Sequence, residues 1–224
     1  MRHEACIVVF VKLPEKGKVK SRLAKDLREE IVLTIYKKFV IDLLNTLKTG
    51  RYPYIITFLP PDAREQIKKW LGKSHIYMPQ RGANLGERMK NAFIGAFSEG
   101  FLNILLIGSD IPDLSYALID QAIRLQDHDA VIGPSYDGGY YLIGFRNDSF
   151  LPQVFEGIPW GTSTVYEQTM EIFIRNNYKV QTLPILRDVD TIDDLRDLFD
   201  RNRNTEFINS KTMEYLSGLP VFLK

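Results

Sequence analysis

The sequence has 224 residues, of which 45% are hydrophobic and 25% are charged, as is usual for an ordinary globular protein. Its 29 lysine and arginine residues nearly balance its 28 aspartate and glutamate residues, and the formal net charge of +1 gives no overall attraction to nucleic acid or to an anionic membrane. A single cysteine excludes an intrachain disulfide, and no apolar run is long enough to span a bilayer.

We expect one cytoplasmic domain over residues 1–224. Arg2, His3 and Glu4 are followed by only a short apolar run, so we expect no secretory signal peptide, and the chain contains no internal repeat, low-complexity tract or linker. The cysteine, Cys6, lies in an apolar run, where a thiol is expected to be buried and chemically inert.

The first predicted strand, residues 5–11, leads into a basic loop over residues 12–23. The loop contains Pro14 and Gly17, and its five cations are Lys12, Lys16, Lys18, Lys20 and Arg22. A loop after the first strand of an α/β sheet is a natural phosphate site, because backbone N–H groups and fixed cations can point at the anion. The loop lacks the ending of a Walker A motif. The alternative is a solvated basic loop with no ligand.

The next elements alternate between helix and strand. Apolar spacing predicts a helix over residues 29–47 and strands over residues 52–59 and 75–78. A second helix, residues 62–71 with Asp62 as its cap, lies between those two strands. This order favours parallel pairing through right-handed crossovers.

A glycine-containing loop then precedes a third helix. Gly82 and Gly86 predict a tight loop that a ligand can approach, and Asn84 is the expected cap of a helix over residues 85–97. Two arginines of this segment either contact a ligand or are simply exposed: Arg81 and Arg88.

The central predicted strand, residues 104–107, is apolar without polar alternation, as in a strand buried on both faces of a parallel sheet. It ends at Gly108, and Ser109 and Asp110 follow. Ligands of open α/β sheets bind at the carboxyl ends of strands, where a carboxylate is well placed to hold a divalent cation on a phosphate. The alternative is that Asp110 is a turn residue or a cap for the helix predicted over residues 114–125.

The segment from Asp137 to Gly139 follows a strand predicted over residues 129–133 and precedes one over residues 140–143. Two glycines there would let the backbone approach a sugar or a base closely, although Asp-Gly-Gly also suits a plain hairpin turn. Farther on, Trp160 stands between Pro159 and Gly161. Its ring either stacks on a ligand or fills a gap in the core.

The last part of the predicted fold contains a helix capped by Thr162 and ending near residue 176, and a strand over residues 178–183. Asp188 and Asp190 then precede another helix, and in extended backbone their side chains point the same way. They either share a cation with Asp110 or cap that helix, as Thr191 also could. Residues 205–224 have no predicted place.

Five segments in this order together resemble the bacterial nucleotide-diphospho-sugar transferase family, including its arsenosugar-biosynthesis-type glycosyltransferases. The segments are Phe10–Leu23, Gly108–Pro112, Gly133–Tyr140, Pro159–Thr164 and Asp188–Thr191. The resemblance extends to about residue 198, and the family is similar to the guanylyltransferases that activate phospholactate and molybdopterin.

The resemblance implies an α/β fold of the GT-A type, with a mostly parallel sheet flanked by helices, and a donor that is a nucleoside-diphosphate sugar or a nucleoside triphosphate. The implied nucleotide and phosphate ligands are Lys12, Gly17, Lys20, Ser21, Arg22, Gly82 and Ser109. The implied ligands of Mg²⁺ or Mn²⁺ are Asp110 and Asp190. The implied catalytic base of an inverting reaction is Asp137, with Gly138, Gly139 and Trp160 on the acceptor or sugar side.

Three functions remain open at this point. The first is a glycosyltransferase with a small-molecule acceptor, in which a metal neutralises the leaving diphosphate. The second is a nucleotidyltransferase that joins a nucleoside monophosphate to a phosphorylated small molecule and releases pyrophosphate. The third is a nucleotide-binding module without catalysis. Fold-level analogy cannot decide among them.

Overall fold

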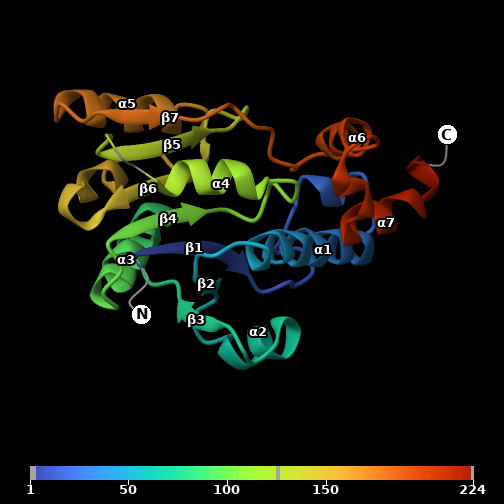
Figure 1. The fold of residues 1–224 in the computed structure, drawn as a ribbon. Helices are drawn as coiled ribbons and strands as arrows, with labels where there is room; N and C mark the ends of the chain where they lie inside the picture. The colour runs from blue at the N-terminus through green and yellow to red at the C-terminus, as the bar shows by residue number, and fades with distance from the viewer. Residues whose placement is uncertain (1–3, 125–126, 223–224) are drawn as a thin grey trace.

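The computed structural model describes residues 4–124 and 127–222, which form a seven-stranded sheet flanked by helices (Figure 1). In chain order, the strands are β1 (Ala5–Lys12), β2 (Tyr54–Leu59), β3 (Ile76–Pro79), β4 (Asn103–Ile107), β5 (Ala130–Pro134), β6 (Tyr140–Arg146) and β7 (Val180–Thr182). They lie in the order β3-β2-β1-β4-β6-β5-β7. Only β6 runs against its neighbours, β4 and β5. The predicted α/β fold with a mostly parallel sheet is confirmed.

Helices connect the strands and extend beyond their carboxyl ends. They are α1 (Glu29–Lys48), α2 (Arg64–Leu71), α3 (Leu85–Ser98), α4 (Tyr116–Ile123), α5 (Val165–Arg175), α6 (Ile192–Arg201) and α7 (Lys211–Ser217). Short 3₁₀ turns lie at Leu23–Lys25, Asn147–Ser149, Pro152–Phe155, Glu206–Asn209 and Pro220–Phe222. None of the helices in the described ranges combines the length and the apolar character that crossing a bilayer requires.

The sheet is buried on both faces, which explains the unbroken apolar run of its first strand. Along β1, Val9 and Val11 pack in the core covered by α1 and α4, whereas Cys6 and Val8 pack in the core covered by α3 and α5. Successive strand residues point to opposite faces, so both sets must be apolar. Burial raises the pKa of the Cys6 thiol to about 12, in line with its predicted inertness.

Two predicted helix caps are wrong, because each helix starts later than expected, after a local turn. The helix expected to start at Asp62 starts at Arg64, after a turn in which the Ala63 N–H donates to the Pro60 carbonyl. The helix expected after Thr162 starts at Val165, and the Thr162 hydroxyl donates to the Pro159 carbonyl at 2.8 Å. By contrast, Asn84 and Ser115 do cap α3 and α4. The predicted end of α4 at residue 125 lies outside the described residues.

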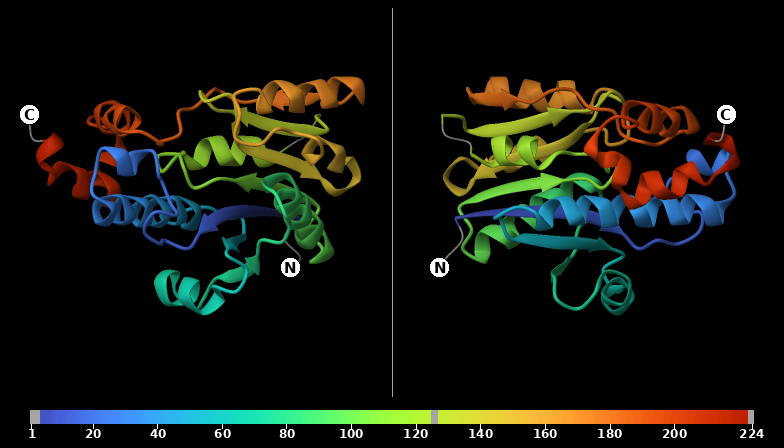
Figure 2. Two further views of the ribbon diagram at one scale, coloured as in Figure 1. Left: turned by 180° about the vertical axis from the view of Figure 1, so that it is seen from behind. Right: turned by 45° about the vertical axis from the view of Figure 1, so that its right-hand side comes forward.

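The tail that had no predicted place packs beside α1, with α6 (Figure 2). Phe39 of α1, Leu195 of α6 and Met213 of α7 share a third core. Buried Asp42 accepts the N–H groups of Lys211 and Thr212 at 2.9 and 2.7 Å, which satisfies the first turn of α7. This unit lies beyond the carboxyl ends of the strands and supports the segment that carries Asp190.

Candidate active site

The carboxyl ends of β1 and β4 are neighbours in the sheet, so the basic loop and the Ser109–Asp110 segment emerge side by side. Tyr36 of α1 joins them. Its hydroxyl oxygen accepts the Lys12 N–H at 2.8 Å and lies 3.5 Å from the Ser109 hydroxyl. Burial raises the pKa of Tyr36 to about 12, so the phenol is neutral and serves as a fixed hydrogen-bonding group.

The Asp188–Asp190 segment reaches the same place through its backbone. Val189 is buried, and its N–H donates to the Asp110 carbonyl at 3.0 Å. Alternation along the segment then puts both aspartates on the cavity side, as predicted. The cap of α6 is Thr191, in a reciprocal pair with Asp194, so Asp190 is free of that role.

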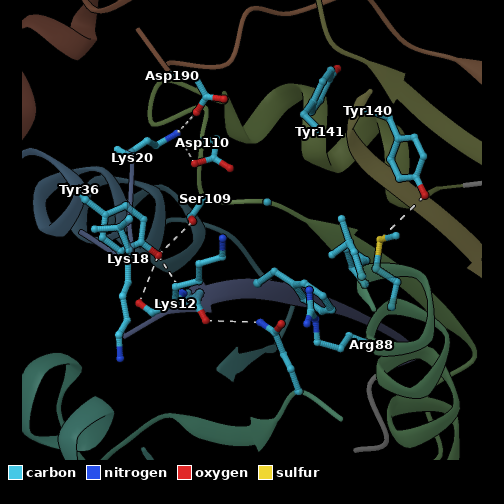
Figure 3. A pocket seen from close by; sticks show the side chains of 18 of the residues that line it. Lys12, Lys18, Lys20, Tyr36, Arg88, Ser109, Asp110, Tyr140, Tyr141 and Asp190 are labelled. Atoms are coloured by element: carbon cyan, nitrogen blue, oxygen red, sulfur yellow. Dashed lines mark hydrogen bonds and ion pairs between the residues drawn. The ribbon is translucent and has the colours of Figure 1, made fainter. Parts of the chain in front are cut away.

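Lys20 lies between the two predicted metal carboxylates (Figure 3). Its ammonium contacts Oδ1 of Asp110 and lies 2.9 Å from Oδ1 of Asp190, and its side chain is only 3% exposed. Arg22 approaches Asp190 more loosely, at 3.8 Å. The loop of Asp110 contains no cation, and the sequence analysis expected a metal ion beside this carboxylate. The structure places Lys20 there. That lysine, assigned to phosphate, comes from the first loop.

The charges of Lys20 and its neighbouring carboxylates shift one another's pKa values. Burial alone would lower the pKa of Lys20, but the carboxylates of Asp110 and Asp190 outweigh it and raise that pKa. Burial alone would raise the pKa of Asp110, but the charge of Lys20 outweighs it and holds that pKa below its usual value. Lys20 and Asp110 therefore stabilise each other's charged forms.

Asp110 and Asp190 fit a hard divalent cation, because such an ion prefers oxygen ligands. Both carboxylates already converge on one positive charge, the ammonium of Lys20. Over residues 4–124 and 127–222, no group of three or more His, Cys, Asp or Glu side chains could hold a metal ion. Mg²⁺ or Mn²⁺ held by Asp110 and Asp190 would therefore take its other ligands from water and from phosphate oxygens of a bound nucleotide.

A cavity of about 450 Å³ opens over the basic loop, and we call it the donor compartment after the ligand that the sequence analysis expects there. It includes five of the seven predicted nucleotide and phosphate ligands: Lys12, Lys20, Ser21, Arg22 and Ser109. Gly17 and Gly82 are not among its lining residues. Gly17 turns the basic loop at φ +72°, and Gly82, at φ +140°, packs over the first turn of α3. These two glycines shape loops rather than border the cavity.

A second cavity, of about 250 Å³, lies on the other side of the acidic pair, and we call it the acceptor compartment after the ligand that the sequence analysis expects there. Three of the residues expected at the base or acceptor side line it: Asp137, Gly139 and Trp160. Oδ1 of Asp137 accepts the Ser135 hydroxyl at 2.5 Å and the Gly139 N–H at 2.9 Å, which fixes the carboxylate. Gly138 does not line the cavity. Its φ is +86°, and a Cβ there would lie 2.0 Å from the Ser163 carbonyl oxygen.

Trp160 both packs against its neighbours and borders a cavity, and its stacking on a ligand stays a prediction. It lines the acceptor compartment and meets the ring of Tyr140 edge-on, with ring centroids 6.2 Å apart. It also packs on Gly86, where an added Cβ would lie 2.6 Å from the indole Nε1. Gly86 is buried and allows α3 to approach this loop, so its predicted role in a ligand-accessible turn is wrong.

Asp188, which the sequence analysis expected to share a cation with Asp110 or to cap a helix, lines the acceptor compartment. Burial, together with the charges of Asp137 and Asp190, raises its pKa to about 6. The spacing of Asp188 and Asp190 indicated a shared direction. The nearness of Asp137 depends on how two distant segments of the chain pack, which one sequence does not reveal.

Comparison with known proteins identifies the family. Residues 43–162 match a family described as "Uncharacterized protein conserved in bacteria (DUF2064)". A protein of Desulfovibrio desulfuricans G20, described as a putative nucleotide-diphospho-sugar transferase, has a similar structure with a TM-score of 0.93 and 45% identity, over 96% of this chain and 94% of that one. The chain belongs to this bacterial nucleotide-diphospho-sugar transferase family. No curated protein matches the sequence.

More distant structures share the fold of this transferase family. One is 4-diphosphocytidyl-2C-methyl-D-erythritol synthase from Anaerococcus prevotii DSM 20548, at 14% identity and a TM-score of 0.56 over 86% of this chain and 92% of that one. Another is Rv0371c from Mycobacterium tuberculosis H37Rv in complex with manganese, at 16% identity and a TM-score of 0.52 over 89% and 100%. Since such likeness establishes only a fold, the side chains must distinguish glycosyl from nucleotidyl transfer.

Proposed function

We propose that this transferase is a glycosyltransferase, which uses a nucleoside-diphosphate-sugar donor with Mg²⁺ or Mn²⁺ and a small-molecule acceptor that carries no phosphate. The observation that supports it most directly is the charge of the acceptor compartment. Four aspartates line this cavity, namely Asp110, Asp137, Asp188 and Asp190, whereas none of its lining residues in the described part of the chain is Lys, Arg or His.

That charge opposes a phosphorylated acceptor. A nucleotidyltransferase of the alternative kind must hold a phosphate group against the α-phosphate of its donor, and a phosphate is held by Arg, Lys or backbone N–H groups. Sugar hydroxyls, in contrast, donate hydrogen bonds that carboxylates accept. The exposed part of the Trp160 indole adds an apolar surface on which a sugar ring can pack.

The donor compartment supplies the opposite charge. Lys12, Lys18 and Arg22 line it and are exposed, so they are available to a diphosphate. Asp110 and Asp190 line both cavities, and the sugar of a donor whose diphosphate meets the basic loop would lie at their junction. A metal ion held by these two carboxylates would neutralise charge on the departing diphosphate.

Transfer breaks the bond between the sugar C1 and the diphosphate oxygen and forms a bond from C1 to the acceptor oxygen. The acceptor hydroxyl must lose a proton, and Asp137 is our candidate for the base. Two hydrogen bonds hold its Oδ1, and no hydrogen bond from the described residues reaches its Oδ2, which leaves that oxygen available to a hydroxyl.

The nucleotidyltransferase alternative draws on the donor compartment, whose five basic lining residues would also suit a triphosphate: Lys12, Lys18, Lys20, Arg22 and Arg88. The acceptor compartment favours it less, because two of the four carboxylates around a phosphorylated acceptor, Asp137 and Asp188, have no cation beside them among the described residues. Lys20 and Arg22 contact only Asp110 and Asp190.

A donor panel tests the proposal. UDP-, GDP-, ADP- and dTDP-sugars and the nucleoside triphosphates are each added with Mg²⁺, with Mn²⁺ and with chelator, and the thermal midpoint is followed, because a ligand of the native state stabilises it by mass action. The best donors are then incubated without acceptor. We expect slow release of nucleoside diphosphate from one sugar donor, which Asp137→Asn suppresses. Pyrophosphate release that requires a sugar phosphate would support the nucleotidyltransferase instead. Binding without any turnover would support the non-catalytic module.

A further inference from the structure

Arg88 is a cation that the proposed chemistry does not use. It is the fourth residue of α3 and lines the donor compartment on the opposite side from Lys20 and Asp190 (Figure 3). Its Nε is buried without a hydrogen-bond partner, and within the described residues no carboxylate lies at ion-pair distance from its guanidinium. Burial lowers the pKa of Arg88, yet the group stays charged.

A half-buried guanidinium without a counter-ion is unusual, because its lost hydration is not replaced. Arg201 shows the usual arrangement. Its guanidinium is similarly enclosed but forms two hydrogen bonds to Asp113. At Arg88 the acceptors are missing from the described protein residues, and the guanidinium borders a cavity. A ligand in that cavity is the natural source of the missing acceptor.

The surroundings of Arg88 indicate the shape of that ligand. Phe10, Leu85 and Met89 give this end of the compartment apolar walls. Gln80 is buried, and its amide nitrogen donates to the carbonyls of Thr57 and Val11 at 3.0 and 3.4 Å, so its amide oxygen is the part left for a ligand. Apolar walls with a few polar groups at one edge suit a flat heterocycle with a hydrogen-bonding rim. The exposed cations for phosphate come from the basic loop, away from α3.

We propose that Arg88 recognises a carbonyl oxygen on the edge of the donor's nucleobase and selects an oxo base, that is uracil, thymine, cytosine or guanine, over adenine. The inference rests on the proposed binding of a nucleotide in the donor compartment. A guanidinium only donates hydrogen bonds, so it pairs with the carbonyl oxygens of these bases. Adenine has no carbonyl oxygen, and where the other bases present one it carries an amine donor or a ring atom, so a guanidinium placed for a carbonyl would lose that hydrogen bond.

Calorimetric titration of UDP, dTDP, CDP, GDP, ADP and pyrophosphate with excess Mg²⁺ tests this selection. We expect the wild-type protein to bind at least one oxo-base diphosphate ten times more tightly than ADP. Arg88→Met should weaken that diphosphate at least tenfold and leave ADP and pyrophosphate within twofold of wild type. Arg81→Met is the matched control, because Arg81 is exposed on the preceding loop and lines neither compartment. It should bind as wild type does.

Stability and a second variant separate recognition from a structural role. Arg88→Met removes an unsatisfied buried group, so it should not lower the thermal midpoint. Arg88→Lys should recover less than half of the lost binding energy, because lysine lacks the planar guanidinium with its several N–H donors. Equal losses for all five nucleotides and for pyrophosphate would make Arg88 a phosphate ligand and overturn the inference. A wild-type preference for ADP would overturn it while sparing the proposed function. If the wild type binds no nucleotide, both fail.

Discussion

Lys20 and Asp110 pair across the gap between the first loop and the central strand, and Asp190 shares the same ammonium. The lysine side chain is almost fully enclosed, at 3% exposure, although its backbone has a φ of +48°, which is uncommon for a residue other than glycine. Its charge therefore occupies the point at which a divalent cation would meet both carboxylates. Lys20 and a metal are expected to compete for one position.

Replacing Lys20 by Met should raise the affinity of the nucleotide-free protein for Mn²⁺. Asp110 and Asp190 would lose the ammonium that neutralises them. In partly exposed surroundings, removing one positive charge about 4 Å from a metal ion should raise the affinity for that ion roughly tenfold or more. Titration of Mn²⁺ followed by electron paramagnetic resonance measures this directly. In chelator, the same variant should bind nucleoside diphosphates more weakly, because the unpaired carboxylates repel phosphate.

The control for this experiment is Lys18→Met. Lys18 lines the same compartment but is 69% exposed and is paired only with Glu15 among the described residues. Its loss should leave Mn²⁺ affinity within about twofold, as is usual for an exposed pair. Equal Mn²⁺ affinities in Lys20→Met and wild type would show that the metal does not use the Asp110 and Asp190 position.

Asp110→Asn should lower turnover with the identified donor by roughly a hundredfold or more, because a neutral amide oxygen is a weak ligand for a hard cation and stabilises less leaving-group charge. Donor affinity should also become insensitive to the choice between Mg²⁺ and chelator. Asp193→Asn, on the exposed face of α6, is the control and should behave as wild type. Full turnover in Asp110→Asn would remove this residue from the mechanism.

Asp188 should make the metal-free protein less stable as the pH rises. Its pKa is about 6 in the folded protein against an ordinary value of 3.8, so folding favours the protonated form. The destabilisation is absent below about pH 4, grows as pH rises toward 6 and is complete above it. Asp188→Asn should therefore raise the thermal midpoint more at pH 8 than at pH 4.5, measured in chelator. An equal increase at both pH values would mean that Asp188 titrates normally.

Asp42→Ala should lower the free energy of unfolding by roughly 2–4 kcal/mol, since two buried N–H groups of α7 lose a charged acceptor. Urea unfolding measures the loss, with the exposed Asp148→Ala as control. Limited proteolysis should cut the variant first near residues 205–217. Wild-type resistance there would show that the third core holds α7 without this contact.

Sequence patterns predicted the sheet well because each strand is a local apolar run between turn residues. The same holds for residues that follow strand ends directly, such as Ser109 and Asp110, since the topology of a parallel sheet places such ends together. Caps were less predictable. Thr162 has the right residue type, but its hydroxyl bonds within its own turn. The tail was not recognised because its apolar residues complement a stripe on α1 that is distant in sequence.

Contacts between side chains of different loops could not be predicted from the sequence. Lys20 was assigned to phosphate and Asp110 to a metal, and each assignment was reasonable for an isolated residue. Their mutual contact depends on the path of the basic loop, including the positive φ at Lys20, which no local pattern indicates. Arg88 could equally have been an exposed helix residue, and only the burial of its Nε against a cavity makes it informative.

The border formed by Asp110 and Asp190 belongs to both compartments, so neither can fill without changing the field in the other. Negative phosphates beside Lys20 would attract its positive charge toward the donor. Asp110 and Asp190 would then be less neutralised when an acceptor enters the second cavity. Linkage of this kind is reciprocal at equilibrium. Binding titrations should accordingly show that a bound nucleotide changes the affinity for an acceptor by the same factor as a bound acceptor changes the affinity for the nucleotide.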